Sequence, residues 1–493
     1  MPNVQSADVR RVARNFSALV IGGVLSKGVL FAWQILLGNA ILPQEYGVYN
    51  TVFALMAISA MITSGGFGLI VVREGARAPH RLPSYWATSL FLQTCLFLPA
   101  YVGMLAFAVA SGYSETILAY GALAGLSMLL DVFGNVGYDV LIAREQMHVT
   151  SALEIAAILL RVGLAGVALA LGWGLLGVYG ATLLAGVARS GALTWANVRD
   201  GLRPRFPLER ALAWGLVLNS LPLMLAGFLS LAYQHADKLM TTAILGERNT
   251  GYLAPAFLIN FGMIEIISTT LLVAVYPMLA RYYHDDDLHA TFGVLTQTLA
   301  RFMLMVSLPL VLVLSLFAAD IIALLYNDNY APTAGVLAVL VWYTLLTMVG
   351  NVFSKSLLIQ NRQRLTLGIR ALSLLMNVTL NAFFLFQTRD VRGAAVASVL
   401  AEAFATVAML WAFRAEGFDK RAFGLAVGRV LLAGALGAGV MLSAGRVHFI
   451  IGALAGGLAY LAALLALRAV SAQDKALLRQ WGASLPIVGR AFR

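Results

Sequence analysis

The sequence is dominated by blocks of 20 or more apolar residues that are separated by short polar segments. A block of this length crosses about 30 Å of hydrocarbon as an α-helix. Charged residues make up 12% of the chain, against about 25% in an average soluble domain. So few polar side chains cannot cover a soluble surface. The alternating strands of an outer-membrane barrel are absent. We therefore predict an all-α polytopic membrane protein.

Fourteen blocks can be placed as transmembrane helices. They lie near 16–38, 46–71, 84–110, 115–138, 152–171, 174–197, 211–244, 250–278, 295–325, 332–358, 366–387, 392–414, 424–443 and 447–468. The seventh and ninth blocks are longer than a bilayer requires, which predicts tilt, a kink or an extension beyond the bilayer. No cleavable signal peptide is apparent, so we expect the first block to serve as an uncleaved anchor.

The distribution of lysine and arginine gives this map an orientation. With fourteen spans both termini lie on one side, and that side holds 25 of the 34 basic residues. The opposite loops hold four, and five fall within spans. Because basic residues favour the cytoplasmic side, we predict cytoplasmic termini in a bacterial inner membrane. The net charge of +11 is thereby explained without a nucleic-acid surface.

Three weak sequence echoes recur in the same order along the chain. They relate 40–55 to 243–258, 141–146 to 358–363, and 177–185 to 393–401, at offsets of 203, 217 and 216. Together they predict two six-helix bundles, residues 1–200 and 211–414, an extra helix pair at 424–468 and a cytoplasmic tail at 469–493. Six spans is an even number, so the two bundles run parallel, as in transporters that rock two halves about a central site.

Charges inside the predicted helices are the main candidates for function, because a charge at the bilayer centre costs about 2.5–3.5 kcal/mol on insertion scales. The candidate substrate-binding residues are Lys27, Gln34, Arg161, Arg189 and Lys238. The candidate ion-coupling residues are Asp237, Glu265 and Glu402. The alternative is that these charges pair with each other or with backbone carbonyls and only fix helix packing. That structural role is favoured for Asp131 and Arg301.

Intramembrane amides are candidates for binding sugar hydroxyls or, equally, for holding helices together. They are Gln34, Asn135, Asn219, Asn260, Asn351 and Asn377. No P-loop, H-E-x-x-H or G-x-S-x-G motif is present, so we predict no catalytic residues, no cofactor and no metal site. The stretch His284–His289 contains ligand-type side chains, but we interpret it as a solvated cytoplasmic loop.

Several segments resemble one known family. They are LPQEYGVYNTVFAL from Leu42, ADKLMTTAILGERNTGYLAPA from Ala236, VYPMLARYY from Val275, IIALLYNDNYAPTAGVLAVL from Ile321, and the small-residue stretches from Gly177 and Gly393. In this order they are similar to the oligosaccharide flippases of the polysaccharide transporter family. That family belongs to the superfamily that also contains the multidrug and toxin extruders and the lipid II flippases. The resemblance runs over about residues 16–414 and implies a V-shaped transporter of fourteen helices.

The resemblance implies a flippase for oligosaccharide linked to undecaprenyl pyrophosphate, working by alternating access. The cations would then hold the diphosphate. Because no nucleotide-binding motif is visible, we expect an ion gradient to supply the energy. We expect a monomer that contacts membrane lipids and the lipid-linked oligosaccharide but no nucleic acid, with a polysaccharide polymerase and export machinery as candidate partners. One alternative is a drug or cation antiporter of the same fold. Another is a membrane glycan polymerase, although external loops of about six residues or fewer leave little room for its substrates.

Overall fold

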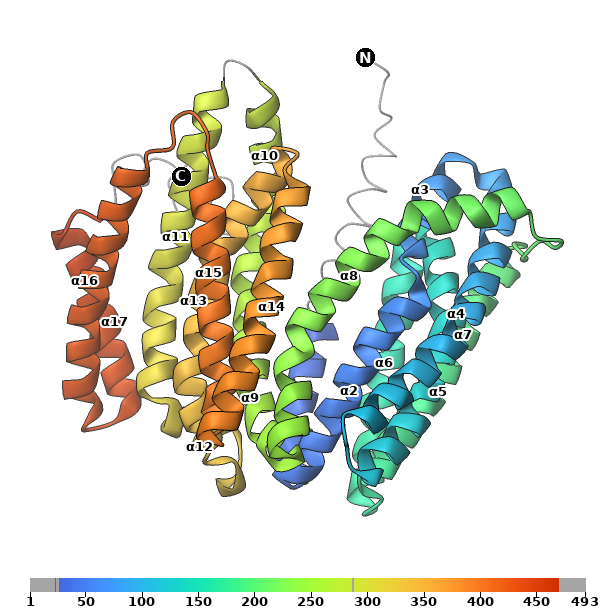
Figure 1. The fold of residues 1–493 in the computed structure, drawn as a ribbon, viewed down its shortest axis with the longest axis horizontal. Helices are drawn as coiled ribbons and strands as arrows, with labels where there is room; N and C mark the ends of the chain where they lie inside the picture. Colours follow the sequence, from blue (N-terminus) through green and yellow to red (C-terminus); the bar gives the residue numbers. More distant parts are fainter. Residues whose placement is uncertain (1–22, 24–25, 286–287, 470–493) are drawn as a thin grey trace, which may run out of the picture. The chain divides into compact units, whose positions relative to one another are not determined.

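The computed structural model describes residue 23 and residues 26–285 and 288–469, and within these ranges the chain contains helices and no strand (Figure 1). Thirteen helical segments of this part are long and apolar enough to cross a membrane. The fourteenth expected span, near 16–38, lies largely outside the described residues, although residues 26–40 are helical. The predicted all-α, many-span architecture is thereby confirmed.

The chain divides into two compact units. The first ends at Pro255 and includes Leu385–Val391, and the second comprises Ala256–Phe384 and the chain from Arg392. Our sequence-based division into two six-helix halves and a terminal pair stays a prediction.

The first unit is built from long helices that begin and end at short turns. They are α2 (Pro43–Ser64), α3 (Phe67–Arg77), η1 (Pro79–Arg81), α4 (Leu82–Ala110), α5 (Glu115–Ala143), α6 (Met147–Ala170), α7 (Gly174–Arg199), α8 (Arg210–Leu245) and the start of α9 (Glu247–Met263). α7 packs against α5 and α6, and α2 packs against α4, α5 and α8. The single helix expected over 46–71 is broken, because Gly65 and Gly66 both have positive φ and separate α2 from α3.

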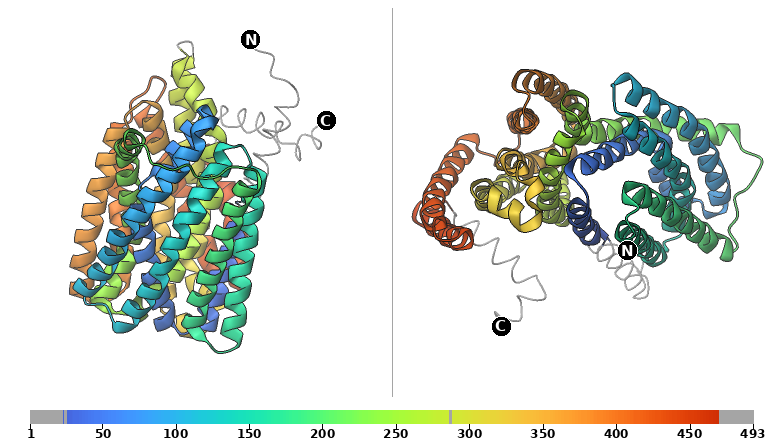
Figure 2. Two further views of the ribbon diagram at one scale, coloured as in Figure 1. Left: turned by 90° about the vertical axis from the view of Figure 1, so that its right-hand side faces the viewer. Right: turned by 90° about the horizontal axis from the view of Figure 1, so that it is seen from below.

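The second unit continues from α9 through a π-helical segment. It contains η2 (Ile264–Thr269), α10 (Thr270–His284), α11 (His289–Leu316), α12 (Ala318–Leu325), η4 (Asp328–Tyr330), α13 (Thr333–Ile359), α14 (Gln363–Thr388), α15 (Arg392–Ala412), α16 (Lys420–Gly445) and α17 (Phe449–Ala466). α13 packs against α11 and α15, while α16 and α17 lie side by side with α16 against α11 (Figure 2). The long block expected near 295–325 is interrupted at Phe317, between α11 and α12.

Helices α2 and α9 meet through two glycines in equivalent positions. Gly47, the fifth residue of α2, lies against the backbone oxygen of Glu247, the first residue of α9. Gly251, the fifth residue of α9, lies in the same way against the backbone oxygen of Pro43, the first residue of α2. A Cβ atom at either glycine would collide with backbone, so this close crossing requires glycine on both helices. The contact joins the two segments of the first sequence echo.

Candidate functional site

Four tyrosines gather inside the first unit, near the N-terminal ends of α2, α5 and α7. The rings of Tyr46 and Tyr49 stack at a centroid separation of 6.4 Å. Tyr49 lies 6.0 Å from Tyr179, which in turn lies 5.2 Å from Tyr120. Three helices that are distant in sequence thus contribute to one aromatic cluster, which we call the tyrosine cluster.

Two predicted substrate-binding residues adjoin the tyrosine cluster. The Oε1 atom of Gln34 accepts a hydrogen bond from the Tyr46 hydroxyl at 3.0 Å. The side chains of Gln34, Trp33 and Arg161 of α6 also lie close enough to Tyr49 to act on it electrostatically. The structure therefore brings Gln34 and Arg161 to one place, although they lie in different spans.

The hydroxyl of Tyr179 is the unusual group in this cluster. Its side chain is 4% exposed, and its oxygen has no hydrogen-bond partner among the described residues. Leaving a buried polar group without a partner costs about 1–3 kcal/mol. A ligand that brings a hydrogen-bonding group to Tyr179 would remove this penalty. Aromatic rings, an amide and a guanidinium together suit a ligand that carries both hydroxyl and phosphate groups.

A second cluster joins α8 to α2. The Lys238 Nζ atom donates a hydrogen bond to the Asn50 Oδ1 atom at 3.1 Å, and Asn50 follows Tyr49 directly in sequence. Lys238 and its neighbour Asp237 are both buried. His235, one turn earlier in α8, is also buried, and its Nδ1 atom has no hydrogen-bond partner in the part of the chain described. Our sequence analysis missed His235, because a single histidine in an apolar block has no distinguishing pattern.

Arg189 of α7 is held by polar groups of its own unit. Its Nε atom lies 2.9 Å from Glu154 Oε1, and its Nη2 atom lies 2.9 Å from Asn135 Oδ1. The Asp131 carboxylate lies 3.6 Å from Nη1. This predicted substrate-binding cation is thus neutralised locally, by a partner on α6 that the sequence analysis did not single out.

Glu402 of α15 is likewise paired within the second unit. Its side chain is fully buried, and its Oε2 atom lies 2.8 Å from Arg370 Nη1 on α14. Arg370 lies two turns inside α14, and the sequence analysis did not single it out as a partner for Glu402. Gly350 of α13 lies nearby: a Cβ atom there would collide with the Thr406 hydroxyl and would lie 3.7 Å from the Glu402 Oε1 atom, an ordinary contact distance.

These two ion pairs occupy corresponding places in the two units with their charges exchanged. The corresponding sets are Gly134, Glu154 and Arg189 in the first unit, and Gly350, Arg370 and Glu402 in the second. The two glycines are 216 residues apart, as are the charged residues on α6 and α14, which matches an offset of the sequence echoes. The charges on α7 and α15 are 213 apart, about one helical turn short of that offset. The same backbone arrangement therefore holds an ion pair whichever of the two helices carries the acidic residue.

The remaining predicted residues, Glu265 and Lys27, belong to other helical segments than the clusters described above. Glu265 is half-buried in the π-helical segment η2, a geometry often found at functional sites. Lys27 has an exposed side chain in the helix 26–40. Within His284–His289, residues 286–287 lie outside the described part, and no group of three metal-ligating side chains occurs among the residues described.

Most of the predicted sugar-binding amides bond to neighbouring helices or to their own helix. Asn260 donates to the Leu340 carbonyl at 2.9 Å, and Asn219 donates to the Gly215 carbonyl at 2.7 Å. Asn351 and Asn377 each lie 3.4 Å from a serine hydroxyl of another helical segment. Apart from the bond of Asn219 within α8, these contacts are those of amides that hold helices together.

Comparison with known proteins gives both a family and a fold. A family model described as "Polysaccharide biosynthesis protein" matches residues 36–335. The chain is similar to the lipid II flippase MurJ in its inward closed conformation, with a TM-score of 0.72, 12% identity, and coverage of 91% of this chain and 98% of that chain. No curated protein matches the sequence.

Two transporters of the MOP superfamily share the fold as well. An inward-facing multidrug resistance MATE family transporter gives a TM-score of 0.60 at 19% identity, covering 78% of this chain and 93% of that one. A MOP superfamily transporter from Pyrococcus furiosus, described as having a binding pocket of reverse polarity, gives 0.54 at 18% identity, with coverage of 82% and 94%. These similarities confirm the predicted transporter fold.

Proposed function

The chain belongs to the polysaccharide biosynthesis protein family, and on that premise we propose that it is a flippase rather than an enzyme. Its substrate is an oligosaccharide linked to undecaprenyl pyrophosphate. It moves this lipid from the cytoplasmic to the outer leaflet of a bacterial inner membrane by alternating access, with both chain termini in the cytoplasm. The likeness to a flippase and to transporters of one superfamily supports this proposal.

The observation that carries the proposal is the tyrosine cluster itself, where Gln34 accepts a hydrogen bond from Tyr46 at 3.0 Å and Arg161 lies near Tyr49. The substrate headgroup combines a diphosphate with sugars. Arginine can make paired, charge-assisted hydrogen bonds to phosphate oxygens. Amide and tyrosine groups can both donate to and accept from sugar hydroxyls. The buried hydroxyl of Tyr179 provides a further hydrogen-bonding group for the headgroup.

The other predicted residues take supporting roles in this proposal. Lys238, together with Asn50, provides a second cation for the diphosphate, and Lys27 provides a third. Asp237 and Glu265 are the proposed ion-coupling residues, because both are acidic side chains within helices. The protein acts as a monomer, in concert with a polysaccharide polymerase and export machinery.

Arg189 and Glu402 remain proposed as a substrate-binding and an ion-coupling residue, but only in a state that opens their ion pairs. In the present structure Glu154 and Arg370 neutralise them. Their contribution to transport therefore depends on a helix rearrangement, whereas that of Arg161 does not.

Export of polysaccharide by cells tests the proposal. In a strain that lacks the gene, the wild-type chain should restore export, and Arg161→Gln should abolish it at an unchanged membrane level of protein. Arg446→Gln, at an exposed position between α16 and α17, is the matched control and should export normally. Normal export by Arg161→Gln would contradict the site. Raised tolerance to lipophilic cations without any export would instead favour a drug antiporter.

A further inference from the structure

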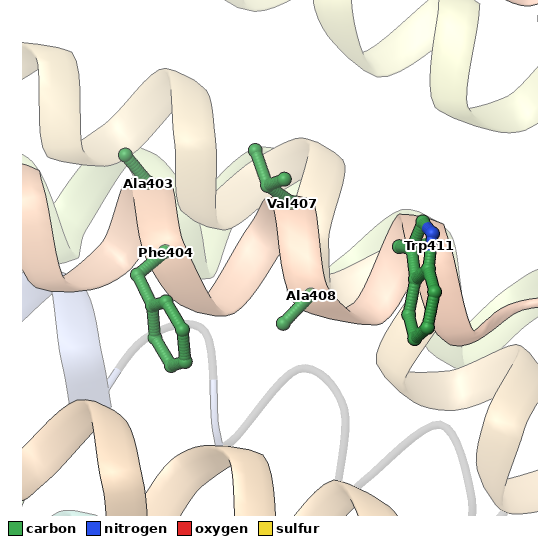
Figure 3. A pocket seen from close by; sticks show the side chains of 5 residues that line it. All are labelled: Ala403, Phe404, Val407, Ala408 and Trp411. Carbon is green, nitrogen blue, oxygen red and sulfur yellow. The ribbon is translucent and has the colours of Figure 1, made fainter.

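One face of α15 forms an apolar groove in the second unit (Figure 3). Ala403, Phe404, Val407, Ala408 and Trp411 line it, and its volume is about 440 Å³. The spacing of these residues places them on one side of the helix over about two turns. The two alanines create the hollow between the three larger side chains. Val407 and Trp411 are largely exposed, at 62% and 72%.

The opposite face of α15 is committed to packing inside the unit. Ala401, Ala405 and Met409 are fully buried, and the helix packs against α13. The groove is thus on the face of the helix that is not used to build the core. In a membrane-spanning helix, such an apolar face contacts lipid chains.

Two cations are fixed at the C-terminal end of the groove. Lys420 Nζ donates to the backbone oxygen of Trp411 at 2.8 Å, and Arg362 Nη1 donates to that of Ala412 at 3.3 Å. The partial negative charge at a helix C-terminus favours cations there. Arg362 comes from the turn before α14 and Lys420 begins α16, so two separate segments converge on one helix end. The exposed Arg414 adds a third cation.

The charge balance around this end is strongly positive. Segments 360–364 and 414–421 together contain five basic and two acidic residues. One of the acidic residues, Asp419, caps the N-terminus of α16 by accepting from the backbone N–H groups of Arg421 and Ala422. Trp411 lies between the apolar groove and the basic segments, the position that tryptophan favours at a membrane interface.

We infer that this groove binds one acyl chain of an anionic phospholipid whose headgroup phosphate contacts Arg362, Arg414 and Lys420. Lipid chains are as apolar as the groove, so the groove positions the chain but contributes little selectivity. Selectivity comes from the headgroup, because basic side chains near the membrane surface attract anionic lipids. The site lies in the second unit and does not use Arg161 or the tyrosine cluster, so it stands without the proposed function.

Native mass spectrometry of the purified full-length chain tests this inference with phosphatidylglycerol and phosphatidylcholine of identical acyl chains. The wild-type protein should retain phosphatidylglycerol preferentially. Arg362→Gln/Lys420→Gln should lower that preference by roughly fivefold for each cation removed. Ala408→Phe, which fills the groove, should reduce retention of both lipids. Arg446→Gln, which removes an exposed cation elsewhere in the unit, should change neither.

Equal retention of the two phospholipids by the wild-type chain would overturn the inference. So would an effect of Arg446→Gln as large as that of the double variant, because the attraction would then be general surface charge. Stronger retention of a polyprenyl diphosphate than of phosphatidylglycerol would overturn the assignment to a phospholipid. Arg414→Gln guards against misfolding of the other variants: its side chain is exposed, and it should lower the preference by roughly fivefold on its own.

Discussion

The ion pair between Arg370 and Glu402 allows a direct test of whether the two units place their ion pairs in equivalent positions. Glu402 is fully buried, whereas the side chain of Arg370 is 26% exposed. Removing one partner of a buried ion pair costs about 3–5 kcal/mol, because the remaining buried charge loses that favourable interaction. Arg370→Gln should therefore destabilise the protein by about that amount. Glu402→Gln should cost less, since the partly exposed Arg370 has a long side chain that can extend toward the membrane surface.

The pair of Glu154 and Arg189 in the first unit carries its charges in the opposite order, and this predicts the effect of exchanging the charges of Arg370 and Glu402. Arg370→Glu alone places two carboxylates together and should be the least stable variant. Arg370→Glu/Glu402→Arg restores the polarity that Glu154 and Arg189 show in the first unit, so it should recover more than half of the lost stability. Gly134 lies tightly against Arg189, and Gly350 lies near the Glu402 carboxylate, so each pair has a residue without a Cβ atom beside it.

Thermal unfolding of the detergent-solubilised chain, followed by tryptophan fluorescence, measures these differences. Domains of 150–250 residues lose roughly 2–4 °C per kcal/mol, so Arg370→Gln should lower the apparent Tm by about 10 °C. The double-mutant cycle gives the coupling energy between positions 370 and 402. If the double variant loses as much stability as Arg370→Glu and Glu402→Arg lose in sum, the reasoning is refuted, because no coupling then exists across the pair.

Three further perturbations follow from the structure. His235 lies one turn from Lys238, the proposed second cation for the diphosphate, and we propose that its unpartnered Nδ1 atom also binds the headgroup. His235→Phe should then lower affinity for the substrate lipid roughly tenfold in a binding titration, whereas His235→Asn should bind as wild type. Gly47→Ala should lower the free energy of unfolding by about 1–3 kcal/mol, as measured by thermal melting, because the Cβ atom of the alanine would collide with the backbone of Glu247. A hydrogen bond from Gln146 lowers the pKa of Asp200 below its ordinary 3.8 in the folded chain, so its stabilisation is complete above that pH and lost as pH falls below it. The Tm difference between wild type and Asp200→Asn should thus be constant from pH 7 to 5 and shrink below pH 4; an unchanged difference at pH 3 would contradict this pairing.

The long apolar helices were predictable because their length and composition follow directly from the thickness of the bilayer. Their breaks were not. Hydropathy is continuous across Gly65 and Gly66, yet their positive φ values end α2. Conversely, Pro222 lies inside the unbroken 36-residue helix α8, since neighbouring groups in a membrane protein can satisfy the freed backbone carbonyl. Local sequence alone does not distinguish these outcomes.

The sequence predicted which charged residues are buried in the candidate site, but not which of them contact one another. The cost of burying charge in a membrane identified Arg161, Arg189 and Glu402 one by one. Their partners Glu154 and Arg370 were missed, because each lies about two turns inside its helix and the residue that it contacts depends on tertiary packing. The GNV stretches at 134–136 and 350–352 are the one sequence signal that would have revealed the paired positions.

The most direct test of the central claim is transport by the purified chain in proteoliposomes. Fluorescent undecaprenyl-diphosphate-linked oligosaccharide is placed in one leaflet, and a membrane-impermeant quencher reports its arrival in the other. The wild-type chain and Arg446→Gln should both flip the lipid faster than protein-free vesicles, whereas Arg161→Gln should match the protein-free rate. Flipping by Arg161→Gln at the wild-type rate would contradict the site, and no flipping by the wild-type chain under an ion gradient of either direction would contradict the proposed function.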